Sequence, residues 1–275
     1  MTYERYRVRL SGAVEGTKRK LEIDRPIKIG VILGTGWGDS LELENKKEIL
    51  LARLLGHELM EIKGHVRKLE FGQCNGKDVL VLRGRVHLNE EPTGDSIPLL
   101  VRLQTELMIK LGVKNLIVTA GVGSLVPSIM IGHVVVVDGF ISLFAPSMPL
   151  WGGEFHSPDD TLDVELQSMA INMAKDVGLV PNPVGYGGYA MVRGPFFEGC
   201  RYDKGILERA GASVVGMSML PEACIAALYD TKVLGLGFVT NNRWEKHTHE
   251  GNLRHAQESS GKLSEYLKRI IDSIA

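Results

Sequence analysis

Short apolar runs alternate along the chain with stretches in which apolar residues recur at helical spacing. The runs are rich in Val and Ile and are bounded by Gly, Asn or Asp, which is typical of buried strands. We predict strands at 27–33, 115–119, 133–138, 189–192, 213–217 and 232–240. The Asn75-Gly76 pair, between a short strand around 68–71 and an apolar run at 79–82, predicts a β-hairpin.

Helical spacing and helix-end signals define the elements between these strands. We predict helices at 98–111, 161–178, 201–210, 221–229 and about 252–274. Carboxylates in a first turn favour a helix start, as with Asp163 and Glu222. Residues 1–26 are charged and weakly periodic, and we interpret them as an amphipathic, helix-prone lead-in. Residues 144–160 are rich in Pro, Gly and Ser, which predicts a long loop.

The order of these elements predicts the fold class. Strands that alternate with helices are typical of an α/β domain, here with a central mixed, largely parallel β-sheet flanked by helices. The length of 275 residues would suit one large domain or two small ones. No internal repeat or linker divides the chain, so we predict a single domain over residues 1–275.

Composition and charge exclude several classes of protein. Hydrophobic residues make up 44% and charged residues 24%, as in an ordinary soluble protein. The formal net charge is −1, so the chain has no excess of basic residues that would indicate nucleic-acid binding. The three cysteines lack CxxC spacing, which favours a reducing compartment over disulfides or a zinc site. The N-terminal residues are too polar for a signal peptide, and no apolar run is long enough to span a membrane. We therefore expect a cytoplasmic protein without membrane contact.

The strand at 79–82 leads into the first candidate site, which contains Arg85 and His87. In an extended chain these two side chains share a face. A guanidinium and an imidazole on one face form an anion site, because both donate hydrogen bonds. The alternative is an exposed end of the sheet with solvated charges.

Further polar or small residues follow the other predicted strands. Gly34-Thr35-Gly36 can form a nest of backbone N–H groups with the Thr35 hydroxyl beside it, although a plain tight turn fits equally well. A second turn of small residues covers 120–124 and includes Gly121. Glu198, Ser218 and Asn241 follow later strands. Since ligands in open α/β sheets bind beyond the carboxyl ends of strands, we expect one composite site.

Several short motifs, taken in order, resemble one family. It is the trimeric, low-molecular-mass purine nucleoside phosphorylases with their methylthioadenosine phosphorylase relatives. The resemblance runs from about Ile27 to the C-terminus, and 144–160 is its least clear part. Its motifs are Gly34-Thr35-Gly36, Gly64-His65, Gly84-Arg85-Val86-His87 with Glu90, Gly194-Pro195-Phe196-Phe197-Glu198, Gly216-Met217-Ser218-Met219-Leu220-Pro221-Glu222 and Val239-Thr240-Asn241.

The resemblance implies a role for each matching residue. The implied phosphate site contains Thr35, His65, Arg85, His87, Gly121 and Ser218. The implied nucleoside site contains Tyr189, Phe197, Glu198, Met217, Asn241 and His249. Catalysis is expected to depend on His87, Glu198, Asn241 and His249. Structural alternatives exist: Glu198 as a helix-start carboxylate, Met217 as a core residue, and His247 with His249 as a metal-binding or merely exposed pair.

The chain also departs from the family pattern. Asn89 replaces a tyrosine that contacts ribose or phosphate in many members, and 120–124 replaces the more usual Asn-Ala-Ala-Gly-Gly. Asn242-Arg243-Trp244 follows Asn241, and the segment up to His249 is shorter than in close members. These differences concern the sugar contacts and His249 rather than the phosphate set or the Glu198/Asn241 pair.

The resemblance and the residue types together predict a function. We expect phosphorolysis of 6-oxopurine ribo- and deoxyribonucleosides, such as inosine and guanosine, to the free base and pentose 1-phosphate. The alternatives are a methylthioadenosine or methylthioinosine phosphorylase and a nucleoside-binding protein with little turnover. The family further implies a homotrimer, with inorganic phosphate as co-substrate and no metal or organic cofactor.

Overall fold

The computed structural model describes most of the chain. It covers residues 2–57, 59, 66–88, 90, 97–145, 150–151, 153–193, 199–245 and 248–274, with the backbone alone at 249, 250, 252 and 253. Its helices are α1 (Tyr3–Leu21), α2 (Leu51–Leu55), α3 (Ile97–Lys110), α4 (Val164–Asp176), α5 (Arg201–Arg209), α6 (Leu220–Ala227), α7 (His249–Glu258) and α8 (Ser260–Ser273), with a 3₁₀ turn at Pro158–Thr161. Its strands are β1 (Ile29–Leu33), β2 (Glu44–Leu50), β3 (Lys68–Cys74), β4 (Lys77–Arg83), β5 (Asn115–Ser124), β6 (Val134–Val136), β7 (Gly139–Phe144), β8 (Gly188–Val192), β9 (Val214–Gly216) and β10 (Lys232–Asn242).

All of these strands belong to one mixed sheet, which confirms the predicted fold class. The main order is β2-β3-β4-β1-β5-β9-β8-β7, and β10 pairs with β5 and β6. The centre is parallel, because β1 pairs with β4 and β5, and β5 pairs with β10. The β3–β4 hairpin and the β5–β9 pair are antiparallel. The hairpin turns at Asn75 and Gly76, which both have positive φ, as the Asn-Gly pair predicted.

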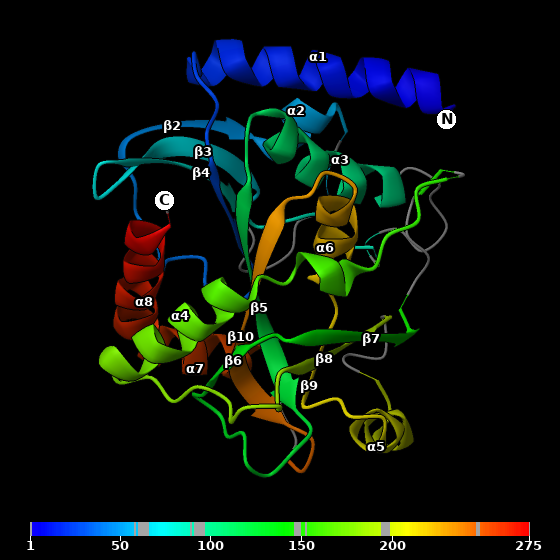
Figure 1. Cartoon of the computed structure of the whole chain (residues 1–275), viewed down its shortest axis with the longest axis vertical. Helices are drawn as coiled ribbons and strands as arrows, with labels where there is room; N and C mark the ends of the chain where they lie inside the picture. Colours follow the sequence, from blue (N-terminus) through cyan, green and yellow to red (C-terminus); the bar gives the residue numbers. More distant parts are fainter. Residues whose placement is uncertain are drawn as a thin grey trace.

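Alternation along the central strands divides the core between the two faces of the sheet. Ile32 and the side chains that share its face of the sheet pack with α1, α3 and α6. Val31 and the side chains on the opposite face pack with α4 and α8. Figure 1 shows α3 and α6 on one side of the sheet and α4 and α8 on the other. The central parallel strands are therefore buried on both sides, which explains why the sequence of each is a continuous apolar run.

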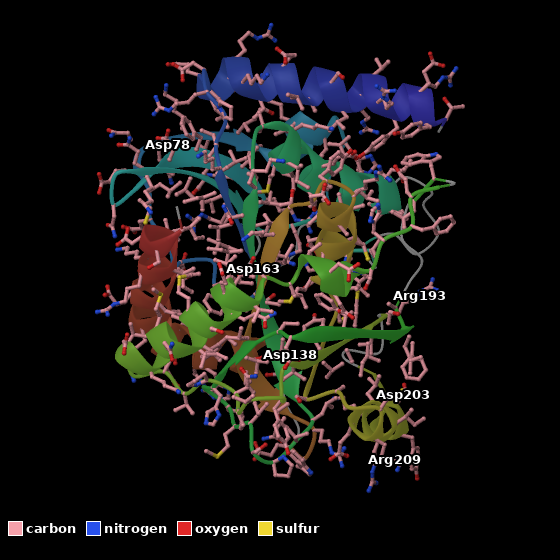
Figure 2. The ribbon with its side chains drawn as sticks, viewed as in Figure 1. Asp78, Asp138, Asp163, Arg193, Asp203 and Arg209 are labelled. Atoms are coloured by element: carbon pink, nitrogen blue, oxygen red, sulfur yellow. The ribbon has the colours of Figure 1, made fainter. Side chains whose placement is uncertain are left out.

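The N-terminal lead-in forms a long helix, α1, which lies across one end of the molecule beside α2 and α3 (Figure 1). Thr2 caps its start by accepting from the Arg5 N–H, and Tyr6, Leu10 and Val14 form its buried stripe. On the opposite side of the sheet, the Asp163 carboxylate caps α4 by accepting from the Leu166 N–H at 2.9 Å (Figure 2). None of the described helices is long and apolar enough to cross a membrane.

Several predicted boundaries were wrong. β5 continues to Ser124 through the predicted turn, because its small residues pair with β10. The last predicted helix is broken at Ser259 into α7 and α8. β2 was missed because most of its residues are exposed and charged, so it contains no apolar run. β7 was also missed; it ends at Phe144, where the predicted loop begins.

Candidate active site

Arg85 lies at the centre of the candidate site and is buried. Strand β4 ends at Arg83, and Gly84 then turns with φ +80° while its N–H donates to the Leu33 carbonyl at 3.1 Å. Arg85 is only 1% exposed, and its Nη1 donates to Glu222 Oε1 at 2.9 Å. Its Nη2 donates to the Thr119 carbonyl. The alternative of a solvated sheet end is therefore wrong, and residues 85–87 lie beyond the strand that we expected to align Arg85 with His87.

Gly34 makes room for this guanidinium. A Cβ atom at Gly34 would lie 2.5 Å from the Thr119 carbonyl oxygen and 2.9 Å from Arg85 Nη2. The Gly34 N–H donates to Thr119 Oγ1 at 3.0 Å, which fixes the end of β1 against β5. A glycine is thus required here by close approach.

Thr35 and Gly121 lie together, as predicted for a shared anion site. A Cβ atom at Gly121 would lie 3.2 Å from the Thr35 carbonyl oxygen and 3.6 Å from Thr35 Cβ. Both residues are partly exposed, whereas Leu33 and Ala120 just before them are buried. The segment after β1 therefore meets β5 at a place where both chains become partly exposed. Gly121 makes this contact from within strand β5, not from a turn.

Met217 and Ser218 directly follow strand β9. β9 runs antiparallel to β5, with Val215 opposite Gly123 and Val214 opposite Ser124, and it ends at Gly216. The Ser218 N–H donates to Tyr189 Oη at 3.4 Å. Met217 is only partly buried, packed at the edge of a small apolar cluster. It is therefore compatible with both interpretations, a core residue and a sugar platform.

The Tyr189 hydroxyl belongs to the same electrostatic environment as Arg85. Burial raises the pKa of Tyr189, the hydrogen bond with Ser218 and then the positive charge of Arg85 oppose that rise, and the negative charge of Glu222 adds to it. A Cβ atom at Gly216 would lie 2.2 Å from Tyr189 Oη, so only glycine fits beside this hydroxyl. Tyr189 is fully buried, and its ring packs edge-on against Phe140.

Asn241 lies at the far end of β10. A register shift between Val239 and Asn241 places it opposite Gly123, and its side chain is 1% exposed. Such irregularities re-aim side chains and are frequent next to active sites. Thr240 Oγ1 donates to Asn241 Oδ1 at 2.9 Å, which orients the amide.

His87 is held through its backbone. Its N–H donates to Glu90 Oε1 at 2.6 Å, and Arg67 Nη1 donates to Glu90 Oε2 at 2.8 Å.

The sequence analysis missed three residues that contact the candidate site, namely Arg67, Thr119 and Glu222. For Glu222 two signals were available, namely its position in the first turn of a predicted helix and its place at the end of the 216–222 motif.

The remaining predicted site residues are not placed by the structure. His65, Phe197 and Glu198 lie outside the described residues, as do Asn89 and His247. His249 begins α7, and its side chain is also outside the description. The roles that the family implies for these residues remain predictions.

Neither the volume of a cavity nor a set of metal-binding side chains identifies the candidate site. The groove of about 870 Å³ between α1 and the β2–α2 segment contains none of the candidate residues. Among the described residues, no group of three or more His, Cys, Asp or Glu side chains could hold a metal ion. The absence of a metal or organic cofactor stays a prediction.

Comparison with known proteins defines the class. Residues 28–272 match the model of the phosphorylase superfamily. The chain belongs to this superfamily. The match begins two residues after the predicted lead-in ends at 26.

Individual relatives refine this assignment. The purine nucleoside phosphorylase of Rattus norvegicus is 28% identical over 99% of this chain and 96% of its own length. Purine nucleoside phosphorylase 1 of Bacillus subtilis is 29% identical over 78% of this chain and 79% of its own. A solved structure of isoform 2 of purine nucleoside phosphorylase from Schistosoma mansoni, in complex with cytosine and ribose-1-phosphate, has a TM-score of 0.82 and 26% identity, covering 100% of this chain and 98% of that one. The predicted resemblance to purine nucleoside phosphorylases is confirmed, as is the prediction that the chain is an enzyme of this family.

Proposed function

We propose that this enzyme cleaves 6-oxopurine nucleosides and deoxynucleosides with inorganic phosphate, releasing the purine and the pentose 1-phosphate. One observation carries the proposal. The buried guanidinium of Arg85 donates to the Thr119 carbonyl and lies against Gly34, next to the place where Thr35 meets Gly121. The Schistosoma mansoni relative, crystallised with ribose-1-phosphate, adds support because that compound is the expected product.

The chemistry follows from the charges that develop. The bond between the sugar C1′ and the purine nitrogen breaks, and its electron pair leaves with the purine. The sugar acquires oxocarbenium character, as in glycoside cleavage. A phosphate oxygen then forms the new bond to C1′. Arg85, His87, Thr35 and Ser218 would hold the phosphate in line, so that catalysis depends on positioning and on charge stabilisation.

The base preference rests on Asn241. Its NH₂ can donate to N7 and O6 of a 6-oxopurine, while Glu198, as a carboxylate, can only accept and thus selects the N1–H of hypoxanthine or guanine. Adenine offers a 6-amino donor and an unprotonated N1. In the adenine-specific relatives an aspartate typically takes the place of Asn241. A site built around polar groups can discriminate ~10⁴-fold against an analogue that leaves them unpaired.

A nucleoside panel tests this proposal. We expect inosine and guanosine to have a higher kcat/KM than adenosine and methylthioadenosine, by a factor of up to ~10⁴. Asn241→Asp should shift the preference toward 6-aminopurines, because the new carboxylate accepts from the 6-amino group. Methylthioadenosine exceeding inosine in kcat/KM with the unmodified enzyme would instead support a methylthioadenosine phosphorylase. Tight binding of inosine without turnover would support a nucleoside-binding protein.

We also propose that the enzyme is a homotrimer. Phe155 is 85% exposed, and it belongs to the segment that the family resemblance implicates in covering a neighbour's sugar site. Trp151 was predicted to need burial against a partner too, but it packs within its own chain, 4.9 Å from the Tyr3 ring and 5.1 Å from the Tyr6 ring between centroids. The proposal therefore rests on Phe155 alone. A fully active monomer by light scattering would contradict it.

A further inference from the structure

Arg67 has a backbone conformation that is unusual for its residue type. It lies just before β3 with φ +58°, in the left-handed region that favours glycine. Its carbonyl accepts from the Leu51 N–H at 2.8 Å, so the backbone is held in this conformation. Strained residues of this kind cluster at functional sites, where the surrounding structure maintains them.

The side chain of Arg67 is also unusual, because it is buried and incompletely paired. The residue is 7% exposed, and Nη1 donates to Glu90 Oε2 at 2.8 Å. The Arg67 and Glu90 side chains are 9% and 3% exposed. Within the described part of the chain, Arg67 Nε and Nη2 are buried without a hydrogen-bond partner. A buried arginine with one satisfied nitrogen is costly, so stability does not explain its presence.

Glu90 connects Arg67 to the candidate phosphate site. One carboxylate oxygen accepts from Arg67, and the other accepts from the His87 N–H at 2.6 Å. The β3–β4 register pairs Lys68 with Arg83, so Arg67 lies beside the chain where it leaves β4 toward Arg85. Sheet register and side-chain contacts thus place Arg67 against the same short segment.

We propose that Arg67 is a positioning residue for phosphate, which acts through Glu90 on His87. This inference rests on the proposed function. The guanidinium pairs with the buried Glu90 carboxylate and holds it on the His87 N–H. That bond fixes the 85–87 segment, which carries Arg85 and His87, two of the proposed phosphate ligands. Without Arg67 the carboxylate loses its buried partner and turns toward solvent, which releases His87.

The test uses Arg67→Gly in the full-length enzyme, with inosine as substrate. Glycine accepts φ +58° without strain, so this variant removes the charge while keeping the backbone conformation. We expect the phosphate KM to rise roughly tenfold or more, with the inosine KM and the kcat at saturating phosphate little changed. The melting temperature should fall, because the buried Glu90 carboxylate loses its partner, so the kinetics are measured at a temperature where the variant is folded. Arg67→Lys should restore part of the phosphate affinity. Millimolar guanidinium should lower the phosphate KM of Arg67→Gly toward that of the wild type.

Asn45→Gly is the matched control. Asn45 also has a positive φ, +50°, but lies in the exposed β2 strand, so this variant makes the same kind of backbone change away from Glu90. Its phosphate KM should stay at the wild-type value and should not respond to guanidinium. An unchanged phosphate KM in Arg67→Gly would overturn the inference, as would an equal loss of inosine and phosphate affinity that guanidinium does not rescue. Failure of the proposed function would be separately visible, because the wild type would then show no phosphate-dependent turnover.

Discussion

Arg85 and Arg102 are both buried arginines paired with carboxylates, but their surroundings differ. Arg102 Nε donates to Glu106 at 2.9 Å, and its two terminal nitrogens donate to Glu154 at 2.7 and 2.9 Å. Its guanidinium also lies 4.7 Å from the centroid of the Trp151 ring and 5.4 Å from that of Tyr6. Around Arg85, by contrast, Nε and Glu222 Oε2 are buried and have no hydrogen-bond partner among the described residues.

The comparison separates a network that supports the fold from one that serves a site. The carboxylate of Glu106 accepts from the hydroxyls of Tyr6 and Tyr229, so the Arg102 network connects α1, α3 and the loop that contains Glu154. Fully satisfied buried networks rigidify a structure. Buried polar atoms left unpaired are rare in native proteins and require an explanation. The proposed function supplies one for Arg85, since this residue follows strand β4 at the carboxyl end of the parallel strands, where open α/β sheets bind ligands.

The largest expected effect is the loss of stability in Arg102→Ala. This change leaves the buried Glu106 and the Glu154 carboxylate without their cation, so the free energy of unfolding should fall by ~3–5 kcal/mol. Urea denaturation measures it. Arg25→Ala is the control, because Arg25 forms an exposed pair with Asp78 at the edge of the molecule (Figure 2) and should leave the unfolding free energy unchanged. A loss in Arg102→Ala no larger than in this control would remove the distinction between the two networks.

The next effect concerns phosphate. Arg85→Ala removes a charge-assisted contact, so the phosphate KM should rise and kcat/KM should fall by the equivalent of ~1.5–3 kcal/mol. Steady-state kinetics with phosphate as the varied substrate measures this loss. Arg102→Ala, assayed where it is folded, should keep a phosphate KM near that of the wild type. Wild-type phosphate kinetics in Arg85→Ala would show that the site has been misplaced.

The smallest effect is a pH dependence of stability. The hydrogen bond from Arg102 lowers the pKa of Glu154 below its usual 4.5, against the opposing effect of burial, and the Trp151 N–H assists. Because the folded-state pKa is the lower one, this stabilisation is present above about pH 4.5 and is lost as the pH falls through the folded value. In Glu154→Gln, the free energy of unfolding should therefore fall less as the pH is lowered, by ~1 kcal/mol or less. A free energy of unfolding that falls with pH as steeply as in the wild type would show that Glu154 does not contribute to the pH dependence of stability.

The sequence predicted the central sheet because parallel strands buried on both faces are continuous apolar runs, as at Val79–Leu82 and Leu116–Val118. It also indicated which strand ends carry polar residues. It could not predict the partner of Arg85, because Glu222 lies 137 positions further along the chain and only the packing of α6 against the sheet brings them together. Arg67 was missed for a related reason. Neither its positive φ nor its contact with Glu90 can be recognised from the local pattern of apolar and polar residues.

The central claim is that phosphate, not water, attacks the nucleoside. The most direct measurement is the incubation of the enzyme with inosine, with and without inorganic phosphate, while hypoxanthine, ribose 1-phosphate and free ribose are quantified. The account predicts that hypoxanthine appears only with phosphate, together with an equal amount of ribose 1-phosphate and an equal loss of phosphate. Release of hypoxanthine with free ribose in the absence of phosphate, or no release under either condition, would contradict it.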